Sequence, residues 1–272
     1  MSRPPDPNRA NDPRYNIRVL DRAFRVLSLL SDGKPRSMQE ISEGIELSTS
    51  TTYRLLSTLT YYNYIQRNEQ TTLYYLGLAC LELAHAYQES DDTRRVALPE
   101  LEALRDEIKE TVHLAVIDRM QIIYLEKLAG LHAIGIMTSR VGARMPAYCT
   151  GLGKVLLAYQ NPEQVIQYFT THEMRQFTST TITNIDILMD QLNIIKKSGY
   201  GFDIGEHEYE VRCVAVPIFD INNKVVAALS VSGPAARLDP VENNKGLIDQ
   251  ARETAINISR KLGYRSANGF SG

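Results

Sequence analysis

Two short helical segments, residues 37–44 and 48–62, constrain the fold most strongly because only three residues separate them. Ser37, followed three positions later by Glu40, forms a capping-box pattern that begins the first helix, and Gly44 ends it. Side chains of the second segment recur with helical periodicity and form one inward stripe: Thr52, Leu55, Leu56 and Leu59. A short helix, a tight turn and an amphipathic helix are typical of a helix-turn-helix.

The segments on either side extend this pattern to a complete small domain. Residues 17–31 are expected to form a preceding helix that ends at the turn 32–35, with these residues on one face: Leu20, Ala23, Phe24 and Leu27. Two short β-prone segments lie between residues 64 and 77, around the polar turn 68–70. The sequence therefore predicts a winged helix-turn-helix over residues 17–77.

The outer side of segment 48–62 carries hydroxyl groups and Arg54, and no carboxylate occurs from residue 48 to residue 67. A helix in the major groove meets bases and phosphates with its N-terminal part, and short side chains allow the backbone to approach closely. The alternative is a solvated helix whose Ser and Thr side chains only cap it. Combined with the neighbouring elements, the pattern favours DNA binding. The candidate contacts are Ser37, Gln39, Thr49, Ser50, Thr51, Tyr53, Arg54, Ser57, Arg67 and Thr71.

The rest of the chain predicts a linker and a second, α+β domain. We expect a leader without structure at 1–16, a linker helix at 78–92, the second domain at 93–265 and a tail at 266–272. Within the second domain, helices are expected at 93–110, 152–160, 162–170, 185–198 and 240–262, and strands at 111–118, 121–130, 133–137, 211–220 and 224–233. Pro99 is expected near a turn or kink. Helices covering a mixed sheet give an α+β architecture.

Composition limits the possible classes of protein. The net charge of the 272 residues is −2, divided into +2 over residues 1–76 and −4 over the remainder, which permits a DNA-binding N-terminal part without requiring one. No apolar run approaches the roughly 20 residues that span a bilayer, so no membrane contact is expected. Three scattered cysteines predict neither disulfides nor a metal knuckle and favour a reducing cytoplasm. The five histidines show no metal-ligand spacing, and no cofactor is expected.

Residues 148–154, YCTGLGK, suggest a phosphate loop but do not match one, because the pattern requires Gly at Tyr148 and a hydroxyl group at Val155. A glycine-bearing turn that opens a helix remains, and its free N–H groups can bind one carboxylate. Side chains that could complete such a pocket are Asp203, Cys213, Ser230 and Ser232, where the two serines share one face of their strand. The sequence therefore indicates a site for a small organic acid.

Two long motifs resemble a known family. The strings LSTSTTYRLLSTL, YIQR and YYLG, followed by SRVGARMPAYCTGLGKVLLA, VRCVAVPIFD and VVAALSVSGP, are similar to those of IclR-type bacterial transcription regulators over residues 17–264. The resemblance implies a winged helix-turn-helix, a linker helix and a GAF- or profilin-like mixed-sheet effector domain. It implies homodimers, often tetramers, that bind a pseudo-palindromic double-stranded DNA operator. It also implies effector contacts at Ile134, Met137, Met145, Gly151, Leu152, Asp203, Val211, Cys213, Ser230 and Ser232.

The resemblance leads to a specific functional expectation. We expect a repressor of a catabolic operon controlled by a sugar acid or keto acid, since residues 139–154 resemble relatives that handle such compounds. An activator of an aromatic-acid or other organic-acid pathway is the alternative. Four positions depart from the family pattern in ways that bear on operator and ligand choice: Ser48, Thr49 and Asn63 in the DNA-binding part, and bulky Leu152 in the pocket.

Two further classes of function stay open at the level of sequence. An enzyme would use Cys149 or Ser230 as nucleophile with His113 or His207 as base, but no nucleophile-elbow spacing supports it. A winged-helix protein that binds only other proteins would have no small-molecule ligand.

Overall fold

The computed structural model describes residues 17–131 and 137–265, and the chain divides into two units between Ser90 and Asp91. The predicted leader, the predicted tail and the expected strand at 133–137, apart from its last residue, lie outside the described residues, as does Ile134. Among the described helices, none combines the length and the apolar character needed to cross a membrane.

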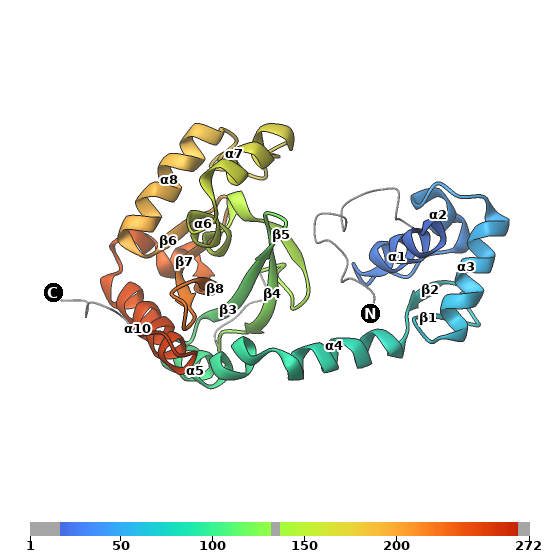
Figure 1. Cartoon of the computed structure of the whole chain (residues 1–272), viewed down its shortest axis with the longest axis horizontal. Coiled ribbons are helices and arrows are strands. Elements are labelled where there is room, and N and C mark those ends of the chain that lie inside the picture. The colour runs from blue at the N-terminus through green and yellow to red at the C-terminus, as the bar shows by residue number, and fades with distance from the viewer. Residues whose placement is uncertain (1–16, 132–136, 266–272) are drawn as a thin grey trace, which may run out of the picture. The chain divides into compact units, whose positions relative to one another are not determined.

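The N-terminal unit is a winged helix-turn-helix followed by a long helix (Figure 1). Its elements are α1 (Arg18–Leu30), α2 (Met38–Gly44), α3 (Thr49–Tyr61), β1 (Ile65–Arg67), β2 (Tyr74–Leu76) and α4 (Leu78–Ser90). Strands β1 and β2 pair antiparallel and form the wing. The predicted inward stripe of α3 is confirmed, because Thr52, Leu55, Leu56 and Leu59 are all buried. The predicted fold of this unit is therefore confirmed.

The apolar face predicted for α1 is wrong in part. Leu20 is 50% exposed and Phe24 is 63% exposed, whereas Val26 and Leu30 are fully buried. The helix carries apolar residues on two sides, and the side facing α2 and α3 is the one that enters the core. Periodicity alone does not distinguish two such sides, because both satisfy helical spacing.

The turn between α2 and α3 depends on two residues. The capping box predicted at the start of α2 is present, with the Ser37 hydroxyl accepting from the Glu40 N–H. Gly44 does not supply the left-handed conformation of the turn; Glu46 does, with φ 55°. Gly44 packs against α1, since a Cβ there would lie 2.9 Å from a terminal methyl group of Leu29, which would have to move aside. This close approach lets the two helices pack.

The C-terminal unit is a six-stranded sheet with helices on both faces (Figure 1). Its helices are α5 (Asp92–Ile108), η3 (Ala147–Cys149), α6 (Gly151–Ala158), α7 (Pro162–Thr171), α8 (Ile185–Ser198), α9 (Ala235–Leu238), η4 (Val241–Asn243) and α10 (Lys245–Lys261). Its strands are β3 (Thr111–Asp118), β4 (Gln121–Leu128), β5 (Arg144–Pro146), β6 (Gly201–Ile204), β7 (Val211–Phe219) and β8 (Val225–Pro234). The strand order is β5-β4-β3-β8-β7-β6. The α+β architecture is confirmed, although all six strands pair antiparallel rather than in mixed directions.

Alternating side chains along the strands divide the core into two layers. On one face, residues such as Leu114 and Val231 pack with helices α5 and α10. On the other face, residues such as Ala115 and Ala215 pack with helices α6, α7 and α8. The central strands are apolar on both faces because helices cover both.

Several boundaries differ from the sequence-based expectation. Asp203 lies within β6, a short edge strand for which the sequence analysis predicted no element. Pro99 lies inside the continuous helix α5 and not at a turn. The final helix, expected from residue 240, begins at Lys245 after a short 3-10 turn. Short elements such as β5 and β6 escape periodicity because three or four residues contain too few repeats.

Candidate functional site

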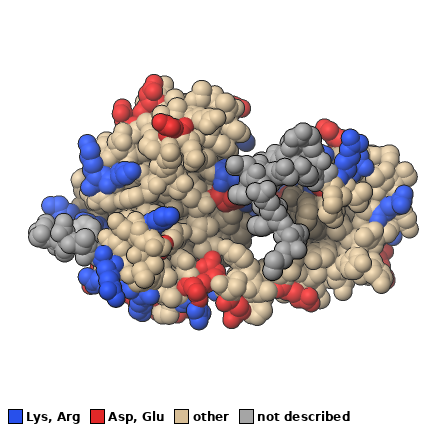
Figure 2. All heavy atoms as spheres, viewed as in Figure 1, with Lys and Arg blue, Asp and Glu red and all other residues tan. Residues whose placement is uncertain are grey.

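The outer face of α3 is exposed and free of carboxylates. The predicted DNA contacts come from α2, α3 and the wing, and all are exposed except Ser37 and Thr51, which are half-buried. Arg54 has no ion-pair partner among the described residues. The visible face of this unit carries few charged side chains (Figure 2). Arg54 is therefore placed to meet an anionic partner.

Several of these side chains already make local hydrogen bonds. The Ser57 hydroxyl donates to the carbonyl of Tyr53 over 2.9 Å. The Gln39 amide donates to the Glu43 carboxylate over 3.0 Å. In the wing, the Arg67 guanidinium lies 5.8 Å from the centre of the Tyr74 ring. These contacts orient the side chains before any partner binds.

In the C-terminal unit, strand register brings the candidate ligand residues into one row. Asp203 of β6 pairs with Cys213 of β7, and Cys213 pairs with Ser232 of β8. In the neighbouring row, Ser230 of β8 pairs with His113 of β3. These side chains come from four adjacent strands and face the α6 side of the sheet, where they line a cavity of about 50 Å³.

Helix α6 closes this cavity with its N-terminus. The Thr150 hydroxyl accepts the Gly153 N–H over 3.1 Å and caps the helix, which leaves the N–H groups of Gly151 and Leu152 without intrahelical partners. A Cβ at Gly151 would lie 2.5 Å from Cys213 Sγ, so only glycine lets the helix approach the sheet this closely. The cavity thus has backbone donors at one wall.

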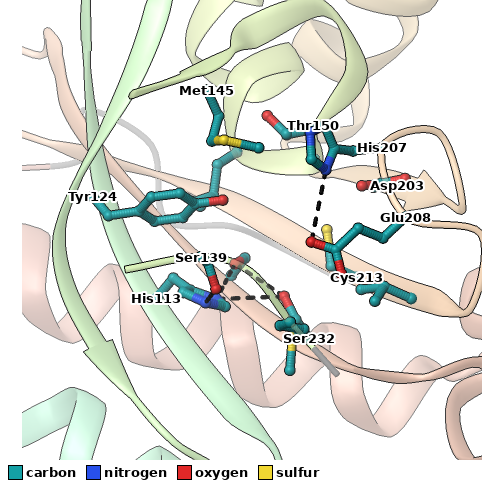
Figure 3. Close-up of a pocket in the computed structure, with 15 residues that line it drawn as sticks. His113, Tyr124, Ser139, Met145, Thr150, Asp203, His207, Glu208, Cys213 and Ser232 are labelled. Atoms are coloured by element: carbon teal, nitrogen blue, oxygen red, sulfur yellow. Dashed lines mark hydrogen bonds and ion pairs between the residues drawn. The ribbon is translucent and has the colours of Figure 1, made fainter. Parts of the chain in front are cut away.

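The cavity contains nine of the ten predicted effector residues: Met137, Met145, Gly151, Leu152, Asp203, Val211, Cys213, Ser230 and Ser232. Figure 3 shows the Tyr124 ring and Met145 on one side and Asp203, His207 and Glu208 on the other. Sequence analysis did not place the following residues here: His113, Tyr124, Ser139, Thr150, His207 and Glu208. For His113 a signal existed, since two-residue alternation puts it on the same side as Ala115.

Burial changes the protonation of the groups in the cavity. Burial lowers the pKa of His113 to about 3, helped by the positive charge of Lys127, so the ring is neutral. Its Nε2 lies 2.9 Å from Ser139 Oγ and its Nδ1 lies 3.4 Å from Ser230 Oγ. Burial raises the pKa of the Cys213 thiol to about 12. A neutral thiol and a histidine of such low basicity are unsuited to nucleophilic catalysis.

Asp203 is protonated over an unusual pH range. Burial raises the pKa of Asp203 from an ordinary value of 3.8 to about 7, and the neighbouring charge of Glu206 contributes to this rise. The backbone N–H of Glu206, which donates to Asp203 Oδ1 over 2.7 Å, acts in the opposite direction and lowers the pKa. Below neutral pH this carboxyl can therefore donate a hydrogen bond into the cavity.

We expect Asp203 to make the stability of the C-terminal unit depend on pH. The folded state holds the Asp203 proton more tightly than the unfolded state does. The contribution of this proton to the free energy of unfolding is therefore complete below pH 4 and is lost as pH rises through 7. Between pH 5 and pH 8 the loss should be about 2 to 3 kcal/mol at 1.36 kcal/mol per pKa unit. Urea denaturation of wild type and Asp203→Asn at both pH values measures it. Equal pH dependence in the two proteins would contradict this assignment.

A winged helix-turn-helix joined to a separate domain with a small polar cavity is typical of ligand-responsive, DNA-binding transcription regulators. The family model described as IclR helix-turn-helix domain matches residues 19–69, and the model described as bacterial transcriptional regulator IclR C-terminal matches residues 85–260. The chain belongs to the IclR family of bacterial transcriptional regulators. Its C-terminal unit is the effector-binding domain of that family.

Individual relatives agree along nearly the whole chain. XynR of Escherichia coli K12 is 33% identical over 249 residues, which cover 91% of this chain and 98% of the relative. KdgR of Dickeya chrysanthemi is 32% identical, covering 89% of this chain and 79% of the relative. The repressor AllR of Klebsiella pneumoniae is 30% identical, covering 91% of this chain and 90% of the relative. These relatives are transcriptional regulators, which excludes the enzyme alternative.

Solved structures show the same architecture. IclR of Thermotoga maritima superposes with a TM-score of 0.71 at 32% identity, covering 92% of this chain and 100% of that one. An IclR homologue from Microbacterium hydrocarbonoxydans, complexed with 4-hydroxybenzoate, gives a TM-score of 0.77 at 26% identity, covering 90% of this chain and 98% of that one.

Proposed function

We propose that the cavity at the N-terminus of α6 binds a small organic acid that controls operator affinity. The observation that carries this proposal is the N-terminus of α6 at the wall of the cavity, where the Leu152 N–H has no intrahelical partner and the Gly151 N–H faces the Cys213 sulfur, beside a row of polar side chains. Helix N-termini favour anions, so the carboxylate of the acid binds there. Protonated Asp203 and the hydroxyls of Ser230 and Ser232 then contact the oxygen atoms next to the carboxylate.

The remaining walls indicate the class of acid. Hydroxyl groups, the neutral imidazole of His113 and the Tyr124 hydroxyl offer many hydrogen bonds, which suits a sugar acid or keto acid. Leu152 and the two methionines Met137 and Met145 limit the size of the ligand. The structural relative complexed with 4-hydroxybenzoate supports an acid that also carries a hydroxyl group. The proposed role is that of a cytoplasmic repressor which the acid releases from DNA.

DNA binding is assigned to α3 and the wing. In this proposal Arg54 binds a base edge or phosphate, the N-terminal residues of α3 enter the major groove, and Arg67 and Thr71 contact the flanking backbone. Exposed apolar side chains at the N-cap of α1, on α1 and on α4 support a homodimer: Ile17, Val19, Leu20, Phe24, Leu78, Leu81, Leu83 and Tyr87. A symmetric dimer binds a pseudo-palindromic operator, and the effector domains of two dimers associate into a tetramer.

Replacing Gly151 by alanine should abolish the response to the acid. The new Cβ meets Cys213 and the backbone nitrogen of Asp203, 3.3 Å away, and displaces the donors of α6. We expect at least about a tenfold weaker affinity in calorimetry with gluconate, 2-ketogluconate and 4-hydroxybenzoate as probes, equivalent to about 1.4 kcal/mol. In a mobility-shift assay on the DNA upstream of the gene, the acid should release wild type but not this variant.

Gly246→Ala is the matched control, because outside the local helix backbone a Cβ there meets, among the described residues, just Asn244 Oδ1 at 3.8 Å. It should bind the acids and release DNA like wild type. Wild-type protein that binds none of the three acids at millimolar concentration, or Gly151→Ala protein that binds them unchanged, would refute the assignment of this cavity.

A further inference from the structure

A groove of about 330 Å³ in the N-terminal unit is lined by residues of α1 and α3. Helix α3 is the helix assigned above to the major groove of DNA, whereas α1 has no part in that assignment. The groove therefore continues the DNA-facing side of α3 onto a second helix. Its lining residues are Val19 and Arg22 of α1 and Thr51, Arg54, Leu55 and Thr58 of α3. We call it the α1–α3 groove.

Two arginines, one from each helix, line this groove without a counter-charge. No carboxylate is among the lining residues. The side chains of Arg22 and Arg54 form no ion pair or hydrogen bond with another residue that the structure describes. Arg22 is nevertheless half-buried. A guanidinium carries a positive charge and five N–H donors, and a partly buried one without acceptors is costly.

The hydroxyl groups of the groove add few donors to those of the arginines. Thr58 Oγ1 donates its proton to the Arg54 carbonyl over 3.0 Å, so its lone pairs can only accept. Thr51 Oγ1 lies 3.0 Å from Ser48 Oγ and shares a hydrogen bond with it. The donors open to an occupant are therefore mainly the two guanidinium groups. Such a groove favours an occupant that brings both acceptors and negative charge.

A phosphodiester of DNA has both properties. It carries one negative charge and two non-bridging oxygens, which a guanidinium binds through two parallel N–H donors. In helix-turn-helix complexes the recognition helix lies in the major groove while neighbouring elements contact the sugar-phosphate backbone. Because α3 supplies one wall of the α1–α3 groove, DNA that meets α3 brings its backbone to Arg22 as well.

We propose that a backbone phosphate of the operator binds in the α1–α3 groove, with Arg22 of α1 as its main ligand. Arg22 donates two N–H groups to the non-bridging oxygens, while Arg54 adds its charge and extends to the adjacent base edge. The bound phosphate fixes the register of α3 on the duplex, since phosphate contacts position a protein and base contacts specify sequence. This proposal rests on the assignment of α3 to the DNA interface.

The first experiment measures the affinity of full-length protein for two duplexes by fluorescence anisotropy at several salt concentrations. One duplex is the DNA upstream of the gene, and the other is a scrambled sequence of the same composition. Arg22→Ala should weaken binding to both by the same factor, at least about tenfold, because a phosphate contact carries no sequence information. The plot of log affinity against log salt should become shallower by about 0.9 for each phosphate lost, or about 1.8 for the proposed dimer.

Two variants serve as controls for this measurement. Arg25→Ala removes the same charge three residues further along α1, at an exposed position that does not line the groove. It should bind both duplexes within about twofold of wild type, with an unchanged salt slope. Arg22→Lys keeps the charge but not the paired donors, so it should recover most of the salt slope and part of the affinity.

The second experiment locates the phosphate. Duplexes that carry one neutral methylphosphonate at a time are scanned along the protected DNA. One position in each half-site should weaken wild type and Arg25→Ala at least about threefold and leave Arg22→Ala unchanged, since the contact is already lost. The other sensitive positions should still affect Arg22→Ala. A merely structural role of Arg22 would not remove the effect of a single phosphate.

Three results would overturn the phosphate site. The first is Arg22→Ala protein with the affinity and salt slope of wild type. The second is an equal loss in Arg22→Ala and Arg25→Ala, which would mean that the overall charge of α1 attracts DNA. The third is altered sedimentation of Arg22→Ala, which would identify the groove as a contact between copies of the chain, because Val19 is also among the residues assigned to the homodimer.

Arg54→Ala separates this proposal from the assignment of α3. Weak, less specific binding by Arg54→Ala together with normal binding by Arg22→Ala refutes only the phosphate site. Normal binding by Arg54→Ala together with weak binding by Arg22→Ala refutes only the role of Arg54 on α3. All these measurements are made without acid, so they do not depend on the ligand of the C-terminal unit.

Discussion

Arg54→Glu is expected to weaken operator binding by at least about 100-fold, since a single Arg contact to a base is worth roughly 1–3 kcal/mol and the proposed dimer loses two such contacts. Reversal of the charge also places a carboxylate near phosphate oxygens, on a face that otherwise has none. Arg54 is exposed and has no ion-pair partner among the described residues, so the fold should be unaffected. Fluorescence anisotropy with upstream DNA at fixed salt measures the loss.

The matched control is Lys245→Glu, which makes the same change in net charge at an exposed position of the effector domain. It should bind the operator within about twofold of wild type. Equal affinity of Arg54→Glu and wild type, with both proteins folded by circular dichroism, would remove α3 from the DNA interface.

Lys154→Met is expected to destabilise the C-terminal unit by about 3–5 kcal/mol, because it leaves the Glu206 carboxylate buried without its counter-charge. Burial already raises the pKa of Glu206, and Lys154 opposes that effect, so removal of Lys154 drives the carboxyl further towards protonation. The denaturation midpoint in urea, followed by circular dichroism, measures the effect.

Two further variants test whether the loss of stability comes from the burial of the Lys154–Glu206 ion pair. Lys261→Met removes an exposed ion pair with Glu100 and should cost at most about 1 kcal/mol. Lys154→Met combined with Glu206→Leu replaces both charges and should recover most of the lost stability. A Lys154→Met protein as stable as Lys261→Met would show that the buried pair contributes little.

Periodicity and capping patterns predicted the longer elements well. The inward stripe of α3 and the capping box at Ser37 follow from local rules that the tertiary structure does not override. The choice between the two apolar sides of α1 depends on which one meets α2 and α3, and that information is not local. Burial of Val26 instead of Phe24 is the consequence.

The residues that line the cavity were harder to predict from the sequence, because they come together from neighbouring strands. Register pairs Asp203 with Cys213 and His113 with Ser230, and register is set by the whole sheet. Family resemblance supplied most of the positions that the cavity contains, whereas His207 and Glu208 lie in a loop whose path no periodic pattern reports. The protonation of Asp203 required knowledge of burial and therefore required the fold.

The hydroxyl group of Ser57 has a consequence for operator sequence. Its proton is directed to the Tyr53 carbonyl within α3, so its outward lone pairs can only accept hydrogen bonds. A phosphate oxygen has no proton to give, whereas the exocyclic amino groups of cytosine and adenine present one in the major groove. We therefore expect each operator half-site to carry cytosine or adenine opposite Ser57, with thymine or guanine disfavoured at that base.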